Sequence, residues 1–260
     1  MRRSHKICIL IFLLFPICLF AKENSKIESV RNITTTVSKD YLNFYSLQNL
    51  KYLFGGICIA GVSANTNVDR DIQDWYQRSV RNNETNQFSK VVKPVGNIYE
   101  PISIYAGFTL LGSLTKYTTV GAIAHEWGSK SLRAILVGAP VVGVLQYGLG
   151  ASRPTEGSSK WHPFHDTNSV SGHAFMGAIP FLTISKMVKP LYLKTFFYIG
   201  SVATGLSRIN DNKHYSSQVV AGWWIAYLAV TNLDWGKKQK VELCPFFFYD
   251  GWKIQLCLSL

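Results

Sequence analysis

The sequence contains few charged residues, and acidic residues are the scarcer kind. Only 16% of its 260 residues are charged, and 27 Lys and Arg stand against 15 Asp and Glu, which gives a net charge of +12. Hydrophobic residues make up 47% of the chain, which is apolar for a soluble protein and low for one fully embedded in a membrane. No Lys- and Arg-rich stripe with interleaved aromatic residues accompanies the positive charge. We therefore expect no nucleic-acid partner, whereas an anionic substrate or a membrane surface fits the charge.

Cysteine is also scarce, with five in the chain. If an N-terminal leader is removed, Cys58, Cys244 and Cys257 remain; the last two flank an apparent hairpin and could pair. An odd number of cysteines without metal-ligand spacing is more typical of structural thiols. The His-containing segment 161–166 looks like a fragment of a metal site, but no ligand set elsewhere completes it, so a loop at the site entrance is favoured. We predict neither a metal nor a cofactor.

Residues 1–21 have the pattern of a secretory signal peptide. Basic residues open the segment, and the apolar run 7–20 that follows is too short for a comfortable membrane span. Ala21 precedes the expected cleavage site, although Leu19 is larger than the residue usual at its position. We predict an exported protein, with a retained N-terminal anchor as the alternative.

The next segment, residues 22–98, is a polar lead-in that contains one amphipathic helix. Residues 69–90 carry apolar side chains at helical spacing, and we expect that face to pack on the rest of the domain. The residues that share the face are Ile72, Trp75, Tyr76 and Val80.

Residues 99–235 are expected to form the core of an all-α helical bundle. It contains apolar segments of about 16 to 19 residues each, at or just under the length that crosses a bilayer. Because they are apolar nearly all round, they are either membrane helices or the interior of a compact bundle. Residues 241–260 predict a short C-terminal β-hairpin around Asp250-Gly251. The five apolar segments are 101–116, 131–149, 173–188, 190–206 and 215–233.

Basic residues between these segments predict an orientation. If 101–116 is the first span of a cleaved protein, the connections rich in Lys and Arg fall on the cytoplasmic side. We therefore expect an inner-membrane protein with its site on the periplasmic side, or else a soluble periplasmic bundle; the oligomeric state is not predicted. The basic residues are Lys116, Lys130 and Arg133, placed in one loop, then Lys186 and Lys189, and then Lys237, Lys238 and Lys240.

Three short motif segments carry the chemistry. The first ends in Arg153-Pro154, the second is Val170-Ser171-Gly172-His173, and the third runs from Ser207-Arg208 to His214 and Gln218. Buried arginines need an anionic partner, and their forked guanidinium groups match phosphate oxygens. The Ser-Gly turn precedes an apolar helix, where backbone N–H groups and the helix dipole also favour an anion. Histidines beside such a site indicate proton or phosphoryl transfer.

The order and spacing of these segments resemble the three-part motif of the phosphatidic acid phosphatase type 2 and vanadium haloperoxidase superfamily. That motif runs Lys-x6-Arg-Pro, Pro-Ser-Gly-His and Ser-Arg-x5-His-x3-Asp, and the similarity covers about 146–222. The resemblance implies a helical bundle in which His214 is the nucleophile and His173 the general acid. It also implies that no metal is needed by the phosphatases and that vanadate belongs only to the oxidative branch. The phosphate-binding residues that it implies are Arg153, Ser171, Gly172 and Arg208, with Gln146 at the position of the motif lysine.

Two departures from the motif fall at charged positions. Gln146 stands where the motif has lysine, which removes one cation from the phosphate site; Lys160 or Lys213 could compensate. Gln218 replaces the aspartate that orients the nucleophile, yet at four residues from His214 on a helix its side chain can still reach the ring. The acidic residues that could supply the missing negative charge are Asp211, Glu156 and Asp166.

The sequence thus predicts a phosphatase that hydrolyses a phosphate monoester or pyrophosphate, lipid-linked, through a phosphohistidine on His214. Gln146 and Gln218 motivate an alternative, a catalytically weak or inactive phosphate-binding relative. A vanadium-dependent haloperoxidase is disfavoured because its vanadate site needs dense positive charge.

Overall fold

The computed structural model describes residues 25–236, 240–248 and 251–259, and side chains only over residues 32–236. The predicted signal peptide, residues 1–21, lies outside the described residues. The chain divides into two compact units, Met1–Lys39 and Asp40–Leu260, and every feature discussed below belongs to the second.

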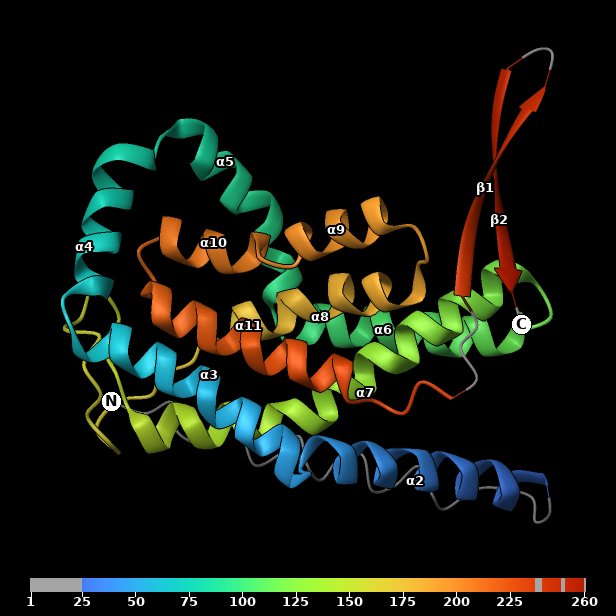
Figure 1. Cartoon of the computed structure of the whole chain (residues 1–260), viewed down its shortest axis with the longest axis horizontal. Coiled ribbons are helices and arrows are strands. Elements are labelled where there is room, and N and C mark those ends of the chain that lie inside the picture. Colours follow the sequence, from blue (N-terminus) through green and yellow to red (C-terminus); the bar gives the residue numbers. More distant parts are fainter. Residues whose placement is uncertain (1–24, 237–239, 249–250, 260) are drawn as a thin grey trace. The chain divides into compact units, whose positions relative to one another are not determined.

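Helices account for most of the described chain, which confirms the all-α class (Figure 1). The elements, in chain order, are α2 (Ser25–Phe44), α3 (Leu47–Asn65), α4 (Val68–Trp75), the π-helical turn η2 (Tyr76–Val80), α5 (Asn83–Val92), the 3-10 turn η3 (Lys93–Gly96), α6 (Tyr99–Leu114), α7 (Thr119–Leu149), α8 (Gly172–Met187), α9 (Leu191–Gly200), α10 (Ala203–Asn210) and α11 (Ser216–Thr231).

Two strands follow the helices. Strand β1 (Lys240–Phe248) pairs antiparallel with β2 (Gly251–Ser259), with Phe248 opposite Gly251. The predicted pairing of Cys244 with Cys257 concerns side chains outside the described ones and stays a prediction.

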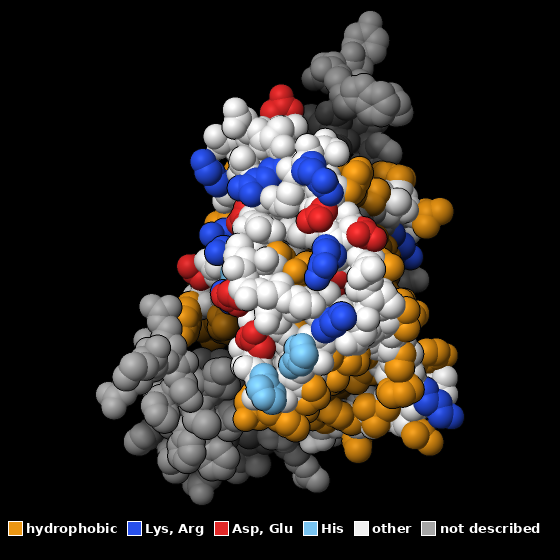
Figure 2. Space-filling model, turned by 90° about the vertical axis from the view of Figure 1, so that its left-hand side faces the viewer, with side chains coloured by type: hydrophobic (Ala, Val, Ile, Leu, Met, Phe, Trp, Pro, Cys, Tyr) orange, Lys and Arg blue, Asp and Glu red, His pale blue; other side chains and the backbone are white. Residues whose placement is uncertain are grey.

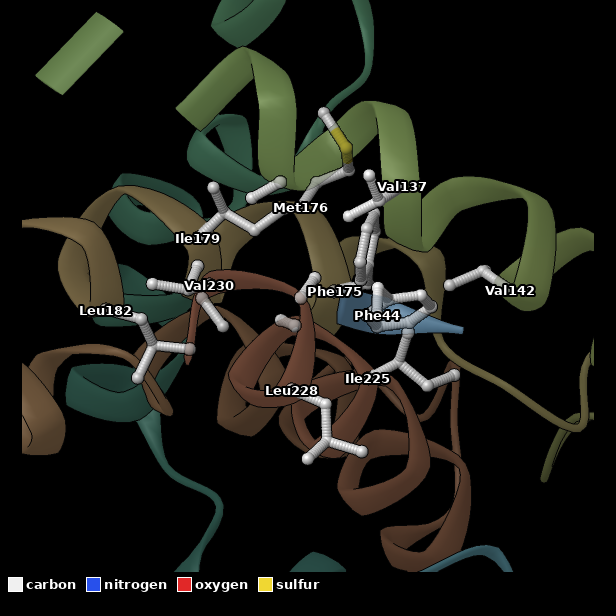
Figure 3. Close-up of a cluster of buried hydrophobic side chains, with 14 of the residues drawn as sticks. Phe44, Val137, Val142, Phe175, Met176, Ile179, Leu182, Ile225, Leu228 and Val230 are labelled. Atoms are coloured by element: carbon white, nitrogen blue, oxygen red, sulfur yellow. The ribbon is translucent and has the colours of Figure 1, made fainter. Parts of the chain in front are cut away.

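The centre of the bundle is formed by α8 and α11, which pack on each other and on α7 (Figure 3). Phe175 and Ile179 of α8 lie against Ile225 of α11 and Val137 of α7, and all four are buried. Burying each such side chain contributes about 1.5–3 kcal/mol. Gly138 lets α7 approach closely, because a Cβ there would lie 2.7 Å from the Phe175 ring. This packing holds the helix ends that carry the second and third motif segments.

The predicted helix over 190–206 is wrong, because the chain breaks into α9 and α10 at Ser201-Val202. Ser201 is buried, and its hydroxyl donates to Tyr198 O at 2.6 Å and accepts the Trp223 indole N–H at 2.8 Å. A serine that bonds backbone and a neighbouring helix competes with continued helix, and hydropathy does not report this.

The amphipathic helix predicted over 69–90 also differs from the structure. It is divided into α4, η2 and α5, and Ile72 and Trp75 of the predicted packing face are exposed. The buried residues of α4 are instead polar, Asp69 and Gln73. Gln73 donates to Ile209 O at 3.2 Å. Of the predicted packing face, Tyr76 does pack on a buried apolar cluster. This part of the chain therefore docks mainly through hydrogen bonds, with Tyr76 as an apolar contact.

Helix α7 begins earlier than predicted and changes the setting of two basic residues. The Thr118 side chain caps it by accepting the Gly121 N–H at 3.0 Å. Lys130 and Arg133 consequently lie inside the helix and not in a loop. Arg133 forms an ion pair of 2.6 Å with buried Asp40.

Candidate active site

The three motif segments meet at one end of the bundle, where α7 ends and α8 and α11 begin (Figure 1). Two hydrogen bonds join the third segment to the others. The Ser171 N–H donates to the Gln218 backbone oxygen at 2.8 Å, and the Gln218 side-chain Nε2 donates to Ser152 O at 2.8 Å. Gln146 joins the same network, because its Nε2 donates to Val170 O at 2.7 Å. Residues that are distant in the sequence therefore form one site.

Gln218 orients the ring of His214. Its Nε2 faces the Ser152 carbonyl, which only accepts, and its Oε1 faces the Tyr215 N–H at 3.1 Å, which only donates. These two partners fix the amide so that Oε1 lies 2.9 Å from His214 Nδ1. Because Oε1 carries no proton, Nδ1 must carry the hydrogen, and the lone pair is on Nε2. The reach predicted from the four-residue spacing is observed.

His214 is held neutral near pH 7. Its side chain is 7% exposed, and burial lowers its pKa to about 4. The nearby cations Arg208 and Arg153 contribute to this lowering, whereas the hydrogen bond that His214 Nδ1 donates to Gln218 Oε1 opposes it. A neutral imidazole with a free Nε2 lone pair is the form required of a nucleophile.

His173 lies on the first turn of α8, directly after the Ser-Gly turn. The Ser171 hydroxyl caps the helix by accepting the Ala174 N–H at 3.3 Å. Burial, together with the positive charges of Arg208, Lys93 and Arg153, lowers the pKa of His173 to about 4, against the raising effect of Asp211. An anion bound beside these cations would raise this pKa again, since opposite charge favours the imidazolium.

The two arginines present donors to this space. Arg208 is 6% exposed, and its Nη1 lies 3.3 Å from Asp211 Oδ2. Its Nε is buried and donates to no atom among the residues that the structure describes. Arg153 donates from Nε to Asn168 Oδ1 at 3.0 Å, and its Nη1 lies 3.6 Å from exposed Glu156. A buried guanidinium N–H without an acceptor is costly unless a ligand supplies one.

Asp69 lies next to the site, at the start of α11, and sequence analysis did not identify it. It is fully buried on α4, and its carboxylate accepts the Ser217 N–H at 2.9 Å and hydrogen bonds from the hydroxyls of Ser216, at 2.7 Å, and Ser217. The carboxylate thus caps the N-terminus of α11, where the helix dipole is positive. Because His214 and Gln218 flank this helix start, Asp69 fixes the base of the site.

The residues predicted to replace the two missing charges are either exposed or bonded to groups other than His214. Lys160 and Lys213 are exposed. Asp211 pairs with Arg208 and Glu156 with Arg153, while Asp166 accepts from Asn168 Nδ2 at 3.0 Å. The hydrogen bonds that His214 donates instead go to neutral acceptors, the Gln218 side-chain oxygen and the Arg208 backbone oxygen.

The described residues include no group of three or more His, Cys, Asp and Glu side chains placed to hold a metal. His162 and His165 of the loop 161–166 are exposed. Phe164 in the same loop has a positive φ of 66° and is also exposed. We assign no residue of this loop to a cofactor.

A second group of charged residues lies toward the other end of α7 and is distinct from the histidine site. It lines a cavity of about 510 Å³ that includes Lys130, Arg133 and Trp235. Lys130 and Gln146 are separated by about 24 Å along the helix axis. The charges there satisfy each other, since Lys130 lies 3.7 Å from Glu126 and Arg133 pairs with Asp40.

The fold and the site together define a helical bundle in which a Ser-Gly turn at a helix start lies with two histidines and two arginines. Residues 129–238 match the model of the PAP2 superfamily, so this segment of the chain is similar to members of that superfamily. No curated protein and no solved structure matches the chain. The match supports the resemblance noted in the sequence, and members of that superfamily are mostly hydrolases that act on phosphate esters.

Proposed function

We propose that this protein is a phosphatase that hydrolyses a phosphate monoester or pyrophosphate through a phosphohistidine on His214. The observation that carries the proposal is the buried Arg208 Nε, which has no acceptor among the described residues although it lies in a cationic site. A phosphoryl oxygen is the acceptor that fits a guanidinium fork. The N–H groups at the start of α8 offer further donors to the same anion.

Binding prepares both histidines for their roles. The phosphoryl oxygens accept from Arg153, Arg208 and the Ser171-Gly172 turn. The negative charge raises the pKa of His173 from about 4, so that this histidine takes up a proton on binding. The hydrogen bond from Nδ1 to Gln218 keeps the His214 Nε2 lone pair directed at phosphorus.

In the first chemical step, His214 Nε2 attacks phosphorus and the bond to the leaving oxygen breaks. His173 transfers its proton to that oxygen, so the leaving group departs as a neutral alcohol or as a phosphate. The arginines stabilise the charge on the equatorial oxygens in the transition state.

In the second step, water attacks the phosphohistidine. His173 accepts a proton from the water, the P–N bond breaks, and its electron pair returns to His214 Nε2. Orthophosphate is released, and the enzyme regains its starting protonation when His173 loses its proton. These two reaction steps require neither a redox change nor a metal.

Several features support a lipid-linked substrate and a bilayer location. One helix of the described chain, Thr119–Leu149, is long and apolar enough to cross a membrane. Large apolar side chains are exposed along α6 and α9, including Leu114 and Phe196, where a soluble protein would expose polar ones. The end with the motif segments carries charged and histidine side chains, with hydrophobic ones along its lower edge (Figure 2). We propose that this polar end faces the exported side of the membrane.

The alternative is a relative that binds phosphate but turns it over slowly. It is favoured by Gln146, whose amide is bonded to a backbone carbonyl and brings no charge to the site. A haloperoxidase would need a denser cationic site for vanadate, so we place it last.

The test is phosphate release from a panel of lipid and soluble phosphate esters. His214→Ala should lower turnover by about 10⁴-fold or more, and His173→Ala by about 10²–10⁴-fold. The matched control is His125→Ala. His125 lies on α7, far from the site, and its ring contacts Thr109 O of α6. Unchanged turnover in His214→Ala would refute the nucleophile. Phosphate binding without turnover in the wild type would establish the alternative.

A further inference from the structure

The 3-10 turn η3 lies directly against the helix turn that carries His173. A Cβ on Gly96 would lie 2.7 Å from His173 O and 3.0 Å from His173 Cβ. On the other side, Val92 O accepts from the Thr204 hydroxyl of α10 at 3.4 Å. The backbone on both sides of Lys93 is therefore fixed against the two helices that carry His173 and Arg208.

Lys93 brings a positive charge to this junction. Its side chain is exposed, and its charge lowers the pKa of His173, with an effect that follows burial and Arg208 but precedes Arg153. The other charged groups that act on His173 are Arg208 and Asp211 of α10 and Arg153 of the loop before α8. Because η3 packs on the turn that carries His173, Lys93 adds a positive charge beside the site.

We propose that Lys93 supplies the third cation of the phosphate site, in place of the motif lysine at whose position Gln146 stands. The inference rests on the proposed phosphate site. A lysine is a compact charge on a flexible stem, so its ammonium can reach a bound phosphoryl oxygen without a preformed fork. Lys93 lies before the segment 129–238 that matches the superfamily, and so outside the motif.

The other lysines are weaker candidates. Lys160 and Lys213 are exposed, and neither is among the groups that shift the pKa of His173 or His214. Lys90 lies one turn before Lys93 near the end of α5 and is also exposed. Lys90 is likewise not among the groups that shift the pKa of either histidine, which makes it the matched control.

The experiment measures binding of inorganic phosphate to the purified full chain by calorimetry, with and without substitutions. Lys93→Met should weaken phosphate binding about tenfold, Lys93→Arg should largely preserve it, and Lys90→Met should leave it unchanged. In the Lys93→Met background, Gln146→Lys should restore affinity, because it returns a cation to the motif position. Lys93→Met should also raise the pKa of His173, read from a pH titration of its ring signals.

Equal phosphate affinity in Lys93→Met and Lys90→Met would overturn the inference, and so would a failure of Gln146→Lys to restore it. A Lys93→Met variant that does not fold is replaced by Lys93→Gln, which is judged by the same criteria. The proposed function fails separately: phosphate binding that depends on Lys93 without turnover would refute catalysis only. Turnover that is indifferent to Lys93 would refute this inference only.

Discussion

Gln218→Glu tests how His214, the proposed nucleophile, is oriented, because a glutamate has nearly the same shape as glutamine and differs in its charge and in lacking the amide donor. The carboxylate keeps an acceptor for the Tyr215 N–H and for His214 Nδ1, which lie 3.1 and 2.9 Å from Oε1. A carboxylate in this contact should raise the pKa of His214 by about 1–3 units from its present value of about 4.

The same substitution has a cost at the other end of the side chain. The donor to Ser152 O is lost, and a carboxylate oxygen faces a carbonyl across the 2.8 Å contact. Because Gln218 is 1% exposed, water cannot compensate, and we expect a loss of about 1–3 kcal/mol in the free energy of unfolding. In Gln218→Asp the side chain is one methylene shorter, so its carboxylate should reach the Tyr215 N–H and His214 Nδ1 less well than that of Gln218→Glu.

Nuclear magnetic resonance titration of the His214 ring, together with urea unfolding, measures both effects. Gln218→Met is the control, since it removes the same hydrogen bonds without adding charge. Its His214 pKa should fall, because the Gln218 bond at present raises that pKa, and its turnover should drop by up to about 10⁴-fold through the wrong tautomer. A His214 pKa that moves in the same direction in both variants, or in neither, would refute this account.

Three further predictions concern the frame of the site. Asp69→Asn should lower the free energy of unfolding by about 2–3 kcal/mol and reduce kcat, because it removes the anionic cap of α11; exposed Asp71→Asn should change neither. Gly222→Ala should destabilise the protein by about 1–3 kcal/mol and impair phosphate binding, since its Cβ would lie 2.3 Å from Ser171 O. Gly55→Ala, with open space around the new Cβ, is the control and should be tolerated. The free energy of unfolding should fall as the pH drops from about 6.5 to 4, by up to about 1.4 kcal/mol per pH unit for each of His173 and His214, and the urea midpoint should fall with it. The unfolded chain takes up these protons and the folded one does not, so a midpoint that stays flat between pH 6.5 and 5 would contradict the lowered pKa values.

The parts of the fold that sequence reasoning predicted well are the helices set by uninterrupted apolar runs. The limits predicted for α8 and α11 are within two residues of the observed ones, because each run is bounded by polar turns. Helix α7 begins earlier than its apolar run because Thr118 caps it. The additional turns, residues 119–130, include polar residues and pack on α6. The break at Ser201 depends on a partner, Trp223, that is 22 residues away and invisible to local pattern.

The sequence by itself determined the candidate reacting groups and their local spacing. Gln218 lies four residues after His214, on the first turn of α11, and this spacing across the helix start brings the two side chains together. The Ser-Gly turn at the start of α8 likewise follows from local chemistry.

Only the tertiary structure decided how these groups are oriented and charged. The Gln218 amide is fixed by Ser152, 66 residues earlier, and α11 is capped by Asp69, 148 residues before Ser217. Lys93 reaches the junction through the packing of η3 on α8. Contacts of this kind arise from the folded arrangement of helices, and hydrogen-bond direction and electrostatic distance have no counterpart in residue order.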